Sequence, residues 1–149
     1  MEDTHKPYID RLRASKIRPT QQRILISKIL FDRPDTFHFT IAGLKEIVEK
    51  STKEKISLAT IYNTVHAFKK KGFLKEISLG NNKNFFDTNT KSHHHFYDEE
   101  TSNLIDVDNK NVCLTNIPKA PSGKKINGIE ITFRIANSNQ SQKIIKSNK

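Results

Sequence analysis

Apolar residues recur at three- and four-residue intervals in the first half of the chain, a spacing typical of amphipathic helices. The clearest helix is predicted over residues 57–73, where Ile61, Val65 and Phe68 share one face. Ser57 is a good N-cap, and a glycine follows the last turn. The other face carries side chains that can form hydrogen bonds: Thr60, Tyr62, Asn63, Thr64 and His66. The pattern fits either an ordinary amphipathic surface helix or a helix that enters the DNA major groove.

The segments around this helix predict a winged helix-turn-helix. Further helices are expected over residues 7–16, after an N-cap at Thr20, and after an N-cap at Thr40, with a loop before the last of them. Strand-like stretches at residues 73–79 and 84–88 flank turn-forming residues and predict a two-stranded hairpin. In this arrangement the last helix reads the major groove while the hairpin and helix ends contact phosphates.

The predicted recognition helix supplies the candidate base contacts. Tyr62 and Asn63 would read or flank base edges, because an amide can pair bidentately with adenine. Thr60 and Thr64 would touch phosphates or thymine methyl groups. Three basic side chains would bind phosphates: Arg18, Arg23 and Lys69. Arg18, in the loop before a helix, could instead enter a narrow A·T-rich minor groove or remain a solvated loop charge.

The second half of the chain is mostly strand-like and follows a hinge-like segment, residues 89–92. Strands are predicted over residues 104–107 and 125–135, and one face of the second would carry Ile129, Ile131, Phe133 and Ile135. A domain of about 45 residues has too small a core to be stable alone. We therefore expect a homodimer with twofold symmetry, which would match a palindromic DNA site.

The sequence therefore predicts an α+β protein in four parts. These are a winged-helix DNA-binding domain (1–88), a hinge (89–92), a dimerisation and ligand-sensing domain (93–136) and a basic, disordered tail (137–149).

The charge distribution agrees with this division. The net charge is +10, and residues 1–90 hold 17 Lys and Arg against 10 Asp and Glu. Residues 91–136 hold 6 of each sign. The positive excess thus lies on the predicted DNA-binding domain and the tail, as expected when one domain meets a polyanion.

The single cysteine, Cys113, excludes an internal disulfide and a Cys₄ structural zinc site within one chain. No signal peptide and no apolar run of about 20 residues is visible in the sequence. We expect a cytoplasmic protein with no membrane partner.

Three consecutive histidines, His93, His94 and His95, follow the hinge. In an extended segment His93 and His95 would point to one side and His94 to the other. Neutral imidazoles suit Zn, Mn or Fe, or the axial position of a haem. The alternative is a polar, solvated loop without a ligand.

Several motifs together resemble those of the ferric uptake regulator (Fur) family. Arg18–Arg23 resembles the start of the family's second helix, and Ser57–Tyr62 resembles its recognition helix. Phe86–Asp87 followed by the triple histidine resembles the end of its wing and its histidine hinge. Asn63, the stretch Phe86–Asn89 and the triple histidine are most similar to the iron response regulator (Irr) branch.

This resemblance implies a winged-helix domain, an α/β dimerisation domain and iron-responsive control of transcription, mainly repression. The narrow-groove role considered for Arg18 makes an A·T-rich palindromic operator the expected DNA partner. Carried over by position, the divalent metal site at the family's domain junction would use His38, Asp87, His95 and Asp106. Irr-type members are similar in binding haem through the histidine run, which would place haem on His93, His94 and His95.

The chain also departs from the family. It lacks the Cys-x-x-Cys pairs that hold structural zinc in many members. Phe96 and Tyr97 stand where the family usually has Asp and His, which weakens the case for a second metal site. Some Irr proteins carry a Cys-Pro haem motif near the N-terminus, but here Lys6 precedes Pro7, which leaves imidazole as the haem ligand.

Two other functions stay open at this point. A metal-independent winged-helix regulator would bind DNA without using the histidines. A metal-storage protein or metalloenzyme would use the histidines and carboxylates, but the sequence has no HExxH pattern and no nucleophile constellation. The basic half would also have no role, so we expect a regulator and not an enzyme.

Overall fold

The computed structural model describes residues 4–80 and 82–138. The chain divides into two compact units, Met1–Thr90 and Lys91–Lys149. The predicted disordered tail lies outside the described residues from residue 139 onward.

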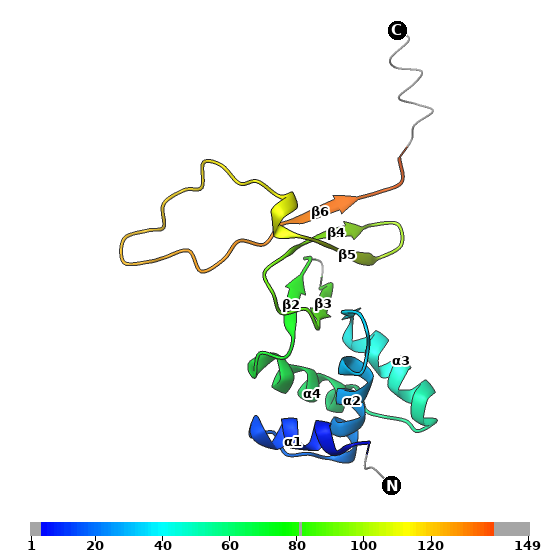
Figure 1. The fold of residues 1–149 in the computed structure, drawn as a ribbon. Coiled ribbons are helices and arrows are strands. Elements are labelled where there is room, and N and C mark those ends of the chain that lie inside the picture. Colours follow the sequence, from blue (N-terminus) through cyan, green and yellow to red (C-terminus); the bar gives the residue numbers. More distant parts are fainter. Residues whose placement is uncertain (1–3, 81, 139–149) are drawn as a thin grey trace. The chain divides into compact units, whose positions relative to one another are not determined.

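The first unit contains four helices: α1 (Lys6–Ala14), α2 (Gln21–Phe31), α3 (Ile41–Thr52) and α4 (Leu58–Lys70) (Figure 1). The three predicted N-caps are confirmed. The hydroxyl of Thr20 accepts from the Arg23 N–H at 3.2 Å, and that of Thr40 accepts from the Gly43 N–H at 3.0 Å. The hydroxyl of Ser57 accepts from the Thr60 N–H at 3.1 Å, so each cap satisfies a donor that the helix leaves unpaired.

The predicted apolar face of α4 is confirmed as the centre of this unit. Ile61, Val65 and Phe68 are each 0% exposed. They pack with Leu12 of α1, with α2 and α3, and with Phe86 in one hydrophobic cluster. Burial of such a side chain contributes about 1.5–3 kcal/mol, so the core fixes which face of α4 meets solvent.

A three-stranded antiparallel sheet completes the first unit. Its strands are β1 (His38–Phe39), β2 (Lys75–Ser78) and β3 (Asn84–Asp87), in the order β1-β3-β2. β2 and β3 form the predicted hairpin. β1 lies in a segment that the sequence predicts to be a loop. The strand could not be predicted, because two residues show no alternation and their partner strand is far away in the sequence.

The second unit is built on another three-stranded sheet. Its strands are β4 (His94–Asp98), β5 (Asn103–Val107) and β6 (Thr132–Ile135), in the order β5-β4-β6. β4 pairs antiparallel with β5 and parallel with β6. Within residues 91–138 the helical structure is a single 3₁₀ turn, η1 (Asn109–Asn111), followed by a long connection to β6 (Figure 1).

The predicted strand over residues 125–135 is too long. Only residues 132–135 form a strand, because these four residues find partners along β4. Ile126, predicted to lie within that strand, is 48% exposed.

The turn between β4 and β5 is fixed by Asp98. Its Oδ1 accepts the Glu100 N–H at 2.9 Å and the Thr101 N–H at 3.3 Å. The Glu100 bond lowers the pKa of the Asp98 carboxyl, because it favours the charged form.

The predicted α+β fold class, a winged helix-turn-helix followed by a smaller second unit, is confirmed. No helix within the described ranges is long and apolar enough to cross a bilayer.

Candidate metal centre and nucleic-acid interface

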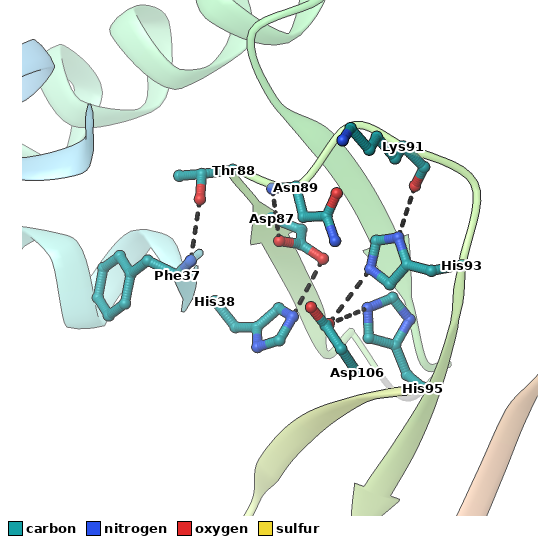
Figure 2. Close-up of polar contacts among 9 residues, drawn as sticks. All are labelled: Phe37, His38, Asp87, Thr88, Asn89, Lys91, His93, His95 and Asp106. Carbon is teal, nitrogen blue, oxygen red and sulfur yellow. Dashed lines mark hydrogen bonds and ion pairs between the residues drawn. The ribbon is translucent and has the colours of Figure 1, made fainter. Parts of the chain in front are cut away.

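In the first unit, strand pairing brings His38 and Asp87 together. They lie directly opposite each other in the register of β1 and β3. The Nε2 atom of His38 is 3.0 Å from Oδ2 of Asp87, whose side chain is 0% exposed (Figure 2). Oδ1 of Asp87 accepts the N–H of Asn89 at 2.8 Å. Burying a carboxylate without such partners costs free energy of folding, so the contacts with His38 and Asn89 help to stabilise Asp87 in this position.

The second unit holds a group of ligand atoms on β5, on β4 and on the residue just before β4. The Nε2 atoms of His93 and His95 lie 3.2 and 3.3 Å from the same oxygen, Oδ1 of Asp106 (Figure 2). His95 is paired with Asp106 in the register of the two strands. The three ligand atoms lie within 4.8 Å of one another, as metal coordination requires.

The second ring nitrogen of His93 supports a ligand role. Its Nδ1 atom lies 2.5 Å from the carbonyl oxygen of Lys91 (Figure 2). A carbonyl only accepts, so Nδ1 donates this hydrogen bond and Nε2 is the ring nitrogen that faces Asp106. Metal-ligating histidines commonly donate their other N–H to a backbone carbonyl, so the group fits a divalent cation.

His94 points away from this group, which confirms the predicted alternation of the histidine run. Its Nδ1 atom accepts the N–H of Ile131 at 3.0 Å and so joins β4 to the segment before β6. All three histidines are buried, with exposures of 4–5%. A haem ligand needs a ring nitrogen facing open space, and these rings are already packed and partnered.

The sequence favours His93 more for haem than for the metal at the junction. In the structure its Nε2 atom faces Asp106 in the same way as that of His95, so His93 joins the candidate metal ligands. The signal was present, because alternate residues of an extended segment share a face and His95 was already a candidate.

Five of the seven predicted DNA-contact residues line one polar hollow of about 320 Å³, beside α4 and the start of α2. The hollow is lined by Arg18, Thr20, Gln22, Arg23, Thr60, Asn63 and Thr64. Arg23 donates from Nη1 to the carbonyl of Arg18 at 3.0 Å, which orders the loop that carries Arg18. Thr20 and Gln22 are not among the predicted DNA contacts, because the fold and not the local pattern places them beside α4.

The other predicted contacts differ in their surroundings. Tyr62 is 51% exposed, so its ring is available to a partner. Thr64 is only 1% exposed, which argues against the predicted direct contact with DNA. Lys69 forms an ion pair with Glu76 on β2, so a phosphate would have to compete for its ammonium group.

The fold and these side chains define a winged-helix protein with candidate metal ligands in each of its two units. The model of the ferric uptake regulator family matches residues 14–134, and the chain belongs to that family.

One curated relative is the peroxide-responsive repressor PerR of Staphylococcus aureus (strain Mu50 / ATCC 700699). It is 34% identical over 97 residues, which cover 64% of this chain and 62% of the repressor. The match thus spans less than two thirds of that relative's length.

Solved structures share the fold over most of their length. The Vibrio cholerae ferric uptake regulator has a TM-score of 0.65 at 19% identity, covering 87% of this chain and 99% of its own. The Pseudomonas aeruginosa ferric uptake regulator with manganese has a TM-score of 0.62 at 15% identity, covering 87% and 97%.

Proposed function

We propose that the chain is a homodimeric, sequence-specific DNA-binding transcriptional regulator whose affinity for DNA responds to a divalent metal ion. The observation that carries this proposal is the occurrence, in one chain, of an exposed hydrogen-bonding face on α4 and ordered groups of imidazole and carboxylate ligands. Membership of the family supports it, as does the repressor activity named for the S. aureus relative. Both favour a regulator over an enzyme.

The DNA part of the proposal rests on the surface around α4. Tyr62 and Asn63 are exposed on this helix, as base-reading side chains must be. Arg18 and Arg23 lie in the hollow that Asn63 also lines, so phosphate and base contacts would be adjacent. We expect the target to be an A·T-rich palindrome bound by the twofold dimer.

The metal part rests on the donor set. Two imidazoles and a carboxylate suit Zn²⁺, Mn²⁺ or Fe²⁺, and the second unit presents His93, His95 and Asp106 together. We propose, as the family resemblance implies, that His38 and Asp87 serve the same ion. Mn²⁺ titration tests this: with one shared ion, His38→Ala and His95→Ala each weaken the same single equivalent. If the sites are independent, each of the two variants would lose a different equivalent of bound Mn²⁺.

Haem is the second ligand proposal and comes from the Irr-type resemblance alone. The burial of the histidine run gives it less support than the metal has. Haem titration would show a Soret shift that is lost when His93, His94 and His95 are replaced together. Iron or haem homeostasis as the regulated process and repression as the main outcome come from the family resemblance and are part of this proposal. The cytoplasmic location expected from the sequence is also part of it.

The experiment that tests the DNA-binding role is selection from a library of random duplexes by the full chain with Mn²⁺. We expect enrichment of an A·T-rich inverted repeat, bound with an affinity that falls steeply as salt increases. No enriched sequence together with a flat salt dependence would overturn the proposal. A metal-independent regulator would instead bind the same repeat equally well with Mn²⁺ and with a chelator.

A further inference from the structure

His66 lies between an exposed tyrosine and the buried core of the first unit. Tyr62 and His66 are four residues apart on α4, so their side chains lie on the same face of the helix. Their ring centroids are 4.0 Å apart and their planes differ by 38°. The His66 ring also meets Phe86 of β3 edge-on, with centroids 5.8 Å apart and planes at 80°. The imidazole therefore contacts the exposed Tyr62 ring as well as the core residue Phe86.

The residue that supports His66 is buried in the core. Phe86 is 1% exposed and stacks on Phe39 of β1, with centroids 5.7 Å apart. These two residues are also paired in the register of β1 and β3. Core side chains of this kind are close-packed in low-energy rotamers, so Phe86 gives His66 a well-packed surface to contact.

An exposed tyrosine on a helix can adopt more than one rotamer, and fixing it on binding costs affinity. A neighbouring ring in contact removes part of that cost before DNA arrives. We propose that His66 is a positioning residue, which holds the Tyr62 ring in the orientation that reads DNA. This inference rests on the proposed function, because it takes Tyr62 as a base-contacting residue.

The test uses the full chain with Mn²⁺ and two duplexes, namely the sequence that the wild type enriches from a random library and a scrambled version of it. The discrimination ratio is the affinity for the first divided by that for the second. We expect His66→Ala to lower this ratio about 2- to 10-fold, the size expected for an ordering cost and one ring contact. His66→Phe keeps a ring on Phe86 and should retain the ratio. Affinity for the scrambled duplex and the salt dependence should stay unchanged in both variants.

A double-mutant cycle separates positioning from other roles. In the Tyr62→Ala background, His66→Ala should cause no further loss of discrimination. Additive losses would overturn the proposal, as would a wild-type ratio in His66→Ala. A His66→Phe variant as poor as His66→Ala would show that the imidazole itself contacts DNA, which also overturns it. If the wild type does not discriminate at all, the proposed function fails and this inference fails with it.

Discussion

The imidazole of His38 and the carboxylate of Asp87 lie 3.0 Å apart although 49 residues separate them in the sequence. The pairing of β1 with β3 sets them opposite each other, so the contact depends on the fold of the first unit and not on a local turn. The strand register therefore fixes the positions of both ligands, and ligands held in this way lose little freedom when they bind a metal.

Removing the Asp87 carboxylate should destabilise the first unit. Asp87→Ala leaves the Asn89 N–H and the His38 ring without their buried acceptor, at a cost of about 1–3 kcal/mol. Asp87→Asn keeps one acceptor oxygen and should cost less. Urea unfolding measures both, with the exposed Asp35→Ala as control. Equal stability of Asp87→Ala and wild type would contradict the assigned contacts.

The group in the second unit should bind metal through two of the three consecutive histidines only. His93→Ala, His95→Ala and Asp106→Ala should each weaken Mn²⁺ binding at least about tenfold, because each removes a ligand atom. His94→Asn is the matched control, since an amide oxygen can still accept the Ile131 N–H. Calorimetric titration gives the affinities. A loss in His94→Asn as large as in His95→Ala would refute the assignment.

Arg18 and Arg23 should contribute phosphate contacts. Arg18→Ala should weaken binding to all duplexes and reduce the slope of log affinity against log salt by about 1. Arg23→Ala should have the same effect on the slope and should lower the affinity for DNA slightly more, because Arg23 also holds the loop that carries Arg18. Lys50→Ala, on α3, is the control. An unchanged slope in Arg18→Ala would show that this side chain remains a solvated charge.

One face of the second sheet should form the dimer interface. Phe96 lies between Ile105 on β5 and Phe133 on β6 in the strand register, and their exposures are 37%, 50% and 38%. A row of exposed apolar side chains across three strands is typical of an interface. Phe96→Asp should give a monomer in analytical ultracentrifugation, whereas Leu114→Asp, equally apolar and 40% exposed, should not. A dimeric Phe96→Asp variant would place the interface elsewhere.

Local patterns predicted the helices well, because their signals lie within a few residues. Thr20, Thr40 and Ser57 mark helix starts by hydroxyl chemistry, and the spacing of Ile61 and Val65 defines a buried face. These features require no knowledge of the rest of the chain.

Features that depend on distant residues were harder to predict. β1 exists because His38 and Phe39 meet β3, and β6 ends where β4 no longer offers partners. Nothing in the helix of Lys69 reveals its ion pair with Glu76, and the phosphate contact of Lys69 stays a prediction. The ligand positions His38, Asp87, His95 and Asp106 came from the family resemblance, since their spacing in the sequence carries no signal of its own.

The most direct test of the account is the affinity of the full chain for its selected duplex, measured with Mn²⁺ and with a chelator. We expect the two affinities of the wild type to differ at least about tenfold, a coupling of about 1.4 kcal/mol. The difference should vanish in a variant with His93, His95 and Asp106 all replaced by alanine. Equal affinities in the wild type, or an unchanged difference in that variant, would contradict the claim that metal bound by these residues controls DNA binding.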